Sequence, residues 1–182
     1  MYSKKILGLL LLFNIYYIYC KTDYSLKSIN SELIKMHGML IALKCYQPEM
    51  GFWSSNGLNT GKIEDKENRY FVRKGFIGEK TISLESSVNK GYFWRVKNGQ
   101  LKLETNDGSN LFKEEASFIP VPGLEDYLLL SLRSFKYPKT YVRHRSGKII
   151  TSSITADSYF LFYNPFSQDA TWRVYTFNNN LR

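Results

Sequence analysis

The sequence has few residues that bind metals or act as thiol nucleophiles. Among 182 residues there are only two cysteines and two histidines. These residue types make up most zinc sites and all cysteine–histidine catalytic pairs, and they form no cluster here. A glycine-rich phosphate loop followed by lysine is also missing. The sequence therefore argues against zinc, cysteine-nucleophile and nucleotide-dependent enzymes, and we expect no cofactor.

Long apolar runs are missing too, apart from the start of the chain. Two lysines at positions 4 and 5 precede an uncharged run from Ile6 to Tyr19. A membrane span needs roughly 20 apolar residues, whereas a basic start before a shorter apolar run is typical of a secretory signal. We expect residues 1–20 to be a signal peptide cleaved after Cys20, with an uncleaved signal anchor as the alternative. The protein is then secreted and has no membrane segment after cleavage.

Cleavage would change both the charge and the cysteine count. The formal charge falls from +9 to +7, and Cys45 is the one cysteine left. One cysteine cannot form an internal disulfide, so a disulfide-stapled small domain is excluded and Cys45 is expected to be a buried apolar residue. The hydrophobic content of 43% is enough for the core of a single domain. The positive net charge is compatible with acidic polymers as partners, but nucleic acid is not expected as a partner of a secreted chain.

Three stretches of the sequence resemble one another. IALKC, ISLES and LSLRS place Leu43, Leu84 and Leu132 at matching positions. An aromatic pair or its equivalent follows about ten residues after each strand begins, and then a turn. The aromatic pairs and the turns are Phe52-Trp53 with Asn56-Gly57, Phe93-Trp94 with Asn98-Gly99, and Tyr141-Val142 with Ser146-Gly147. Asn-Gly between apolar residues is a strong hairpin signal, so each unit is expected to contain a β-hairpin.

The rest of each unit follows the same plan. Beyond each turn lies an aspartate, namely Asp65, Asp107 or Asp157, and then a last apolar strand. Helical periodicity is not sustained between residues 39 and 177. We therefore predict an all-β protein, a β-trefoil of three pseudo-symmetric repeats, because three similar units without cores of their own would close around a shared core. A β-sandwich is the alternative.

The predicted boundaries follow from these patterns. Residues 21–38 form a leader, either a short amphipathic helix with Leu26, Ile29, Leu33 and Met36 on one face or a frayed segment. The trefoil covers residues 39–177, and residues 178–182 are a tail. The expected repeats are 39–80, 81–127 and 128–177.

Two of the repeats also carry distinctive motifs. Between Ser83 and Leu124 the second contains GYFWRVKNG, TNDGSN and EEASFIPVPGL, and the third contains YVRHRSG and QDATWRV. This set resembles the arabinose-binding (AbfB) domain at the C-terminus of α-L-arabinofuranosidase B, over most of residues 39–177. The resemblance implies a β-trefoil that binds arabinofuranose side chains of hemicellulose, with one shallow pocket per repeat. It also implies a binding module without the hydrolase, for which we expect no room in this chain.

The resemblance assigns the sugar contacts to the basic run and the aspartate of each repeat. An aspartate accepts hydrogen bonds from neighbouring hydroxyls, an aromatic ring covers a C–H face, and arginine or histidine donates. The implied contacts are Tyr141, Arg143, His144 and Asp157 in the third repeat, Tyr92, Arg95 and Asp107 in the second, and Asp65 in the first.

No repeat matches the family pattern fully. The second has Val96 where the family has histidine, and in the third Asp157 comes two residues late. The first has Ser54-Ser55 in place of the basic run. The sequence therefore ranks the third site first and the second next, and it predicts that the first is silent.

Several of these residues have a structural alternative. Asn-Asp-Gly-Ser around Asp107 also suits a tight turn, and the two roles are compatible. His144 is either a sugar contact or a structural histidine bonded to a neighbouring strand. For Trp53 and Trp94 a place in the core is the favoured interpretation.

Two other functions compete with sugar binding by a non-catalytic monomer. Glycoside hydrolysis needs two carboxyls about 5–10 Å apart, and aspartates related by threefold symmetry should lie far apart. A label of arabinofuranosidase activity, or of a role in L-arabinose metabolism, would then reach this chain only because its domain family bears that name. It would not reflect chemistry of the chain's own residues. The alternative is a basic trefoil that binds acidic or sulfated polysaccharide through the cations of one hairpin, Lys136, Lys139, Arg143, Arg145 and Lys148.

Overall fold

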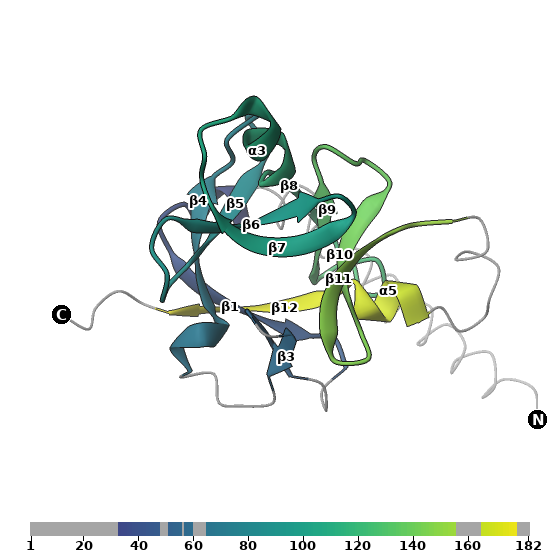
Figure 1. Cartoon of the computed structure of the whole chain (residues 1–182). Helices are drawn as coiled ribbons and strands as arrows, with labels where there is room; N and C mark the ends of the chain where they lie inside the picture. The colour runs from purple at the N-terminus through teal and green to yellow at the C-terminus, as the bar shows by residue number, and fades with distance from the viewer. Residues whose placement is uncertain (1–32, 48–50, 56, 60–64, 156–164, 178–182) are drawn as a thin grey trace, which may run out of the picture.

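The described part of the molecule consists almost entirely of short antiparallel strands (Figure 1). The computed structural model describes residues 33–47, 51–55, 57–59, 65–155 and 165–177. The predicted signal peptide, most of the predicted leader, Asp157 and the tail lie outside these residues. The strands are β1 (Leu40–Cys45), β2 (Phe52–Ser54), β3 (Gly57–Asn59), β4 (Arg69–Lys74), β5 (Ile82–Ser86), β6 (Tyr92–Lys97), β7 (Gln100–Thr105), β8 (Phe118–Pro122), β9 (Leu130–Ser134), β10 (Thr140–Arg145), β11 (Lys148–Ser153) and β12 (Trp172–Phe177). Three short helical elements join them: η1 (Lys66–Asn68), α3 (Asn110–Glu115) and α5 (Pro165–Asp169).

Six of the strands form a closed ring. β1 pairs with β4, β4 with β5, β5 with β8, β8 with β9, β9 with β12, and β12 again with β1. Closure leaves no strand of the ring with an unpaired edge, which is how small all-β domains satisfy their backbone hydrogen bonds. The other six strands form three hairpins, β2–β3, β6–β7 and β10–β11. Each hairpin is joined to the ring through its first strand, which pairs with β1, β5 or β9.

Left-handed turn residues close two of the hairpins. Lys97 pairs with Gln100, so Asn98 and Gly99 form a two-residue loop, with φ of 51° and 72°. Ser146 and Gly147 form the equivalent loop of β10–β11, with φ of 50° and 74°. Positive φ at both positions is typical of the type I′ turn that matches strand twist. The predicted Asn98-Gly99 and Ser146-Gly147 turns are confirmed.

The first hairpin turns one residue earlier than its sequence predicts. Gly57 already belongs to β3, where it pairs with Ser54. The loop is therefore made by residues 55 and 56, of which Asn56 lies outside the described residues.

The interior of the ring is filled by side chains from equivalent strands. Leu43, Leu84 and Leu132 all have zero exposed area. Each pairs with an apolar residue on the strand before it around the ring; these partners are Val174, Val72 and Pro120. The three leucines were predicted from their spacing to occupy matching places. All three are buried, and the pseudo-symmetry of the repeats stays a prediction.

Three tryptophan rings pack together inside the molecule. Trp53 lies with its ring centroid 5.3 Å from that of Trp94 and 5.5 Å from that of Trp172. Trp53 and Trp172 are fully buried and Trp94 is 4% exposed, which confirms the core interpretation of Trp53 and Trp94. Such tilted ring pairs add to the energy of burial. Cys45 is also buried, as predicted.

The end of the predicted leader packs against this core. Residues 33–35 are helical, Leu33 is 2% exposed, and Met36 contacts the core cluster. Within the described residues, no helix has the length and apolar character of a membrane span.

Candidate functional site

In the second unit, the arginine of the basic run is held by an acid at the end of a helix. Arg95 in β6 is only 3% exposed. Its Nε and Nη2 both donate to Oε2 of Glu115, at 3.0 and 2.5 Å, and its guanidinium lies 4.7 Å from the centre of the Phe112 ring. Glu115 is the last residue of α3, and Ser109 caps the start of that helix by accepting from the Phe112 N–H. A planar guanidinium suits such a combination of carboxylate and ring.

The outer edge of the same arginine faces two further carboxylates. Arg95 Nη1 donates to Glu104 Oε2 at 3.2 Å and lies 3.8 Å from Asp107 Oδ2. Asp107 has a side chain that is 54% exposed. Its Oδ1 accepts from the Ser109 N–H at 2.8 Å, and the hydrogen bonds from Ser109, followed by the charge of Arg95, lower the pKa of the Asp107 carboxyl. Asp107 is therefore both a turn former and an exposed, ionised group.

A lysine from the next unit completes this network. Lys136, in the connection between β9 and β10, donates from Nζ to Glu115 Oε1 at 2.8 Å. That hydrogen bond raises the pKa of Lys136. Glu115, at 2% exposure, thus accepts from two cations at once, which offsets the cost of burying its charge.

The third unit repeats the arrangement of arginine, acid and ring. Arg143 in β10 donates from Nη2 to Asp169 Oδ2 at 2.7 Å, and its guanidinium lies 4.9 Å from the centre of the Phe166 ring. Asp169 ends α5, as Glu115 ends α3. The Tyr141 ring packs edge-on against Phe166, with centroids 6.3 Å apart.

His144 points the opposite way from Arg143 and is nearly buried. Alternation along β10 turns Val142 and His144 toward the interior, and His144 is 3% exposed. Its Nε2 lies 3.2 Å from Asp169 Oδ1, and its ring packs edge-on against Trp172. Burial lowers the pKa of His144, and burial raises the pKa of Asp169. In this position His144 contacts the acid that holds Arg143 instead of facing solvent.

The remaining predicted site residues are spread over the hairpins. Tyr92 begins β6 and is 39% exposed. Asp65 directly precedes η1, without capping it through its side chain, and Ser54 follows Trp53 where Arg95 follows Trp94. The first unit therefore has no arginine at this position. Asp157 lies outside the described residues.

Comparison with known proteins places these motifs in a family. Residues 53–174 match the family described as the alpha-L-arabinofuranosidase B (ABFB) domain. The chain belongs to this family.

Curated relatives of the AbfB chain are much longer than the chain itself. A probable alpha-L-arabinofuranosidase B of Aspergillus clavatus is 36% identical over 103 residues, which is 57% of this chain but 20% of that protein. The alpha-L-arabinofuranosidase B of Emericella nidulans is 34% identical over 93 residues, 51% of this chain and 18% of the relative. The similarity thus covers about a fifth of each enzyme.

Solved structures show the fold. An arabinofuranosidase complexed with arabinofuranosyl-alpha-1,2-xylobiose superimposes with a TM-score of 0.63 at 24% identity, covering 77% of this chain and 31% of that one. The protein SeviL bound to asialo-GM1 saccharide superimposes with a TM-score of 0.56 at 12% identity, covering 75% and 96%. The BEL β-trefoil also gives 0.56, at 11% identity, covering 78% and 94%. The AbfB chain therefore has a β-trefoil-like fold, and the β-sandwich alternative is excluded.

Sequence reasoning missed the acids that hold the two arginines of the AbfB domain. Glu115 and Asp169 occur in EEASF and QDATW, where an acid precedes Ala, a hydroxyl residue and an aromatic. Both motifs were visible in the sequence, but nothing in either places its acid beside an arginine that lies 20 or 26 residues earlier. Among the described residues, no three His, Cys, Asp or Glu side chains group as metal ligands.

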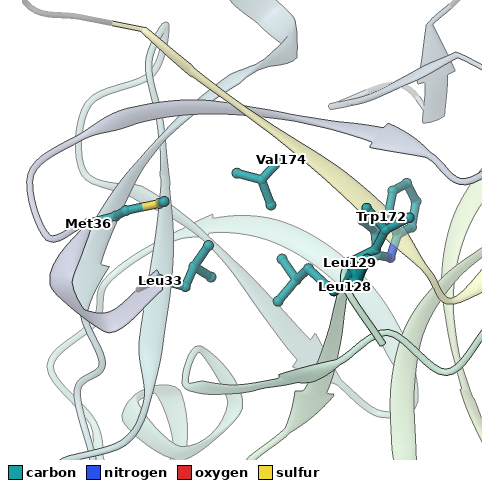
Figure 2. Close-up of a pocket in the computed structure, with 7 residues that line it drawn as sticks. Leu33, Met36, Leu128, Leu129, Trp172 and Val174 are labelled. Carbon is teal, nitrogen blue, oxygen red and sulfur yellow. The ribbon is translucent and has the colours of Figure 1, made fainter. Parts of the chain in front are cut away.

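An apolar cavity of about 190 Å³ lies away from these residues (Figure 2). It opens between the helical turn of the leader, the residues around the start of β9, and β12. Its lining residues are Leu33, Met36, Leu128, Leu129, Leu130, Trp172 and Val174. None of the predicted sugar contacts lines it.

Proposed function

We propose that this AbfB domain is a secreted, non-catalytic carbohydrate-binding module for arabinofuranose groups, acting as a monomer. Its pockets are shallow and belong to the second and third of three pseudo-symmetric repeats, 81–127 and 128–177, which follow a first repeat at 39–80. Membership of the family supports this proposal, as does the relative that was solved with an arabinofuranosyl-xylobiose.

The observation that carries the proposal is the exposed carboxylate of Asp107. One oxygen is fixed by the Ser109 N–H and the other faces Arg95, so the group is ionised and oriented before a ligand arrives. A carboxylate held in this way accepts charge-assisted hydrogen bonds from two neighbouring hydroxyls. Tyr92 pairs with Thr105, two residues before Asp107, which brings an exposed ring to the same end of the hairpin. The ring supplies the apolar surface for the C–H face of the sugar.

The sequence of the third unit contains the same types of side chain, with different neighbours around them. We assign Tyr141, Arg143 and Asp157 to its pocket, with His144 acting through Asp169. Asp65 marks the first unit, which we propose is silent because Ser54 takes the place of the arginine.

The charges near Arg95 also support a non-catalytic role. Glu104 and Asp107 both approach its Nη1, so their separation alone does not exclude a glycosidase pair. Hydrolysis, however, needs one carboxyl that stays protonated as the general acid. The pKa of Asp107 is lowered, and Glu104 accepts from both Arg95 and Lys97. Asp107 is therefore not in the surroundings of a general acid.

Calorimetric or NMR titration with an arabinofuranosyl oligosaccharide tests the proposal. We expect weak sites with a Kd of about 1 mM, which corresponds to a binding free energy of about −4 kcal/mol. Asp107→Asn should weaken the second site by about tenfold, the value of one hydrogen bond to a charged group. Asp157→Asn should do the same for the third site.

Asp126→Asn is the matched control. Asp126 also sits in a turn and accepts from the N–H two residues ahead, that of Leu128, but it has no arginine beside it among the described residues. If Asp107→Asn and Asp157→Asn bind as the wild type does, the sugar sites are assigned wrongly.

The second candidate function, binding of acidic polysaccharide through the basic hairpin, has less support from the contacts. Lys136 and Arg143 are already bonded to Glu115 and Asp169. Lys139, Arg145 and Lys148 remain exposed. A glycan array at low and physiological salt separates the two functions, because screening weakens a polyanion complex and hardly changes a neutral sugar complex.

A further inference from the structure

Two cations face each other across β1 and β12. Lys44 is directly opposite Arg173 in the antiparallel register. Among the described residues, neither side chain forms an ion pair with a carboxylate. Like charges directly opposite on neighbouring strands destabilise a sheet. This pair therefore costs folding energy that no acid of the described chain offsets.

Aromatic rings surround the two cations. The Lys44 ammonium lies 5.6 Å from the centre of the Phe52 ring, and the Arg173 guanidinium lies 5.7 Å from the centre of the Tyr46 ring. Tyr175 is two residues beyond Arg173 on the same face of β12, packs edge-on against Phe52 at 5.8 Å, and is 38% exposed. We call these five residues the β1–β12 surface.

The β1–β12 surface is separate from the predicted arabinofuranose contacts. β1 and β12 run side by side in the ring (Figure 1), and none of the residues assigned to sugar pockets belongs to either strand. The polar side chains beside it include the amides of Gln47 and Gln168, which are hydrogen-bonded to each other at 3.1 Å. The Gln168 amide also donates to Glu125 Oε1 at 3.3 Å.

We propose that the β1–β12 surface binds an acidic polysaccharide. Adjacent strands are about 4.8 Å apart, so one uronate carboxylate reaches both Lys44 and Arg173. The ring of Tyr175, which is exposed, and that of Tyr46, which is half-buried, then contact the C–H faces of neighbouring sugar rings. A uronic-acid polymer supplies both the charge and the ring faces that this combination of cations and aromatics recognises. The proposal does not depend on the arabinofuranose sites.

The test is titration of the full chain with an oligogalacturonate at low and physiological ionic strength. Lys44→Gln/Arg173→Gln should weaken binding by about tenfold or more, because two charge-assisted contacts are lost. Tyr175→Ala should also weaken binding, although it leaves the charge unchanged. The melting temperature of the double variant should equal or exceed that of the wild type, since the repulsion between the two strands is relieved.

The chain offers a matched control in the β10–β11 hairpin. Arg145 and Lys148 are also directly opposite each other, and both are exposed, but no ring contact accompanies them in the described structure. Arg145→Gln/Lys148→Gln removes the same charge from the basic hairpin of the second candidate function, and it should weaken oligogalacturonate binding clearly less than Lys44→Gln/Arg173→Gln does. A larger loss in the hairpin variant would place the polymer on that hairpin and overturn the proposal. Equal losses in the two double variants would show that net charge alone attracts the polymer, which overturns the site. Absence of oligogalacturonate binding by the wild type overturns it as well. Arabinofuranose titration of the same variants should be unchanged, so the two proposals succeed or fail separately.

Discussion

Removing the carboxylate of Glu115 tests how the buried arginine of β6, Arg95, is held. In Glu115→Gln, Arg95 loses the charge that accepts from its Nε and Nη2, and Lys136 loses its partner. The Arg95 side chain is 4% exposed, so it cannot turn to water, whereas the Lys136 side chain is 23% exposed and can. The destabilisation therefore comes mainly from an arginine left buried without its acid.

The size of the effect follows from that burial. Breaking a buried ion pair by removing one partner costs about 3–5 kcal/mol in the free energy of unfolding. Arg95 keeps its contact with Glu104, whose side chain is 32% exposed, so the lower end is expected, about 3 kcal/mol. For a domain of this size that is a fall in melting temperature of about 6–12 °C. Urea unfolding followed by tryptophan fluorescence measures it directly.

Two further variants make the measurement decisive. Glu104→Gln removes an acid of the same arginine at a partly exposed position and should cost no more than about 1 kcal/mol. Arg95→Met/Glu115→Gln should be less unstable than the sum of its single variants, because no charge is then stranded. A Glu115→Gln protein within about 1 kcal/mol of the wild type would refute the view that this buried pair holds the hairpin to α3.

Three other predictions follow from the contacts. Because burial lowers the pKa of His144 below its ordinary 6.5, the unfolded chain binds a proton that the folded chain does not, and unfolding free energy should fall as pH drops below 6.5. In urea unfolding measured over a series of pH values, His144→Asn should not show this fall in unfolding free energy. The opposite contribution of Asp169, whose raised pKa adds stability at low pH, should stay. Identical pH profiles of the unfolding free energy in variant and wild type would contradict this. Gly123→Ala should cost about 1–3 kcal/mol in thermal unfolding, because its Cβ would stand 2.3 Å from the Asp126 carbonyl oxygen; an unchanged midpoint would contradict it. Arabinofuranose binding by the second unit should persist as pH falls to 3.8, because the pKa of Asp107 lies below that ordinary value, and loss by about pH 5 in a titration series would contradict this.

The hairpins and the core could be predicted from local sequence. Asn98-Gly99 specifies a tight turn through its own backbone preferences, and the spacing of Leu43, Leu84 and Leu132 shows which strands share an interior. The first hairpin was placed one residue late, because Asn-Gly signals a turn but the register of β2 with β3 decides where it falls.

The contacts around the candidate site were predicted only in part. The motifs drew attention to Arg95, Arg143 and Asp107, since each stands in a short pattern that suits sugar binding, and their role in sugar pockets stays a prediction. They left open which way His144 points, because alternation along β10 depends on which face packs inward.

By itself, the sequence determined the strand-forming pattern, the turns, the buried leucines and the family, since these depend on neighbours along the chain. Only the tertiary structure decided which charges meet. Glu115 joins Arg95 and Lys136, and Lys44 faces Arg173, across long sequence separations. Closure of the strand ring brings these groups together, and electrostatic interaction depends on distance in space and on burial, neither of which a linear pattern contains.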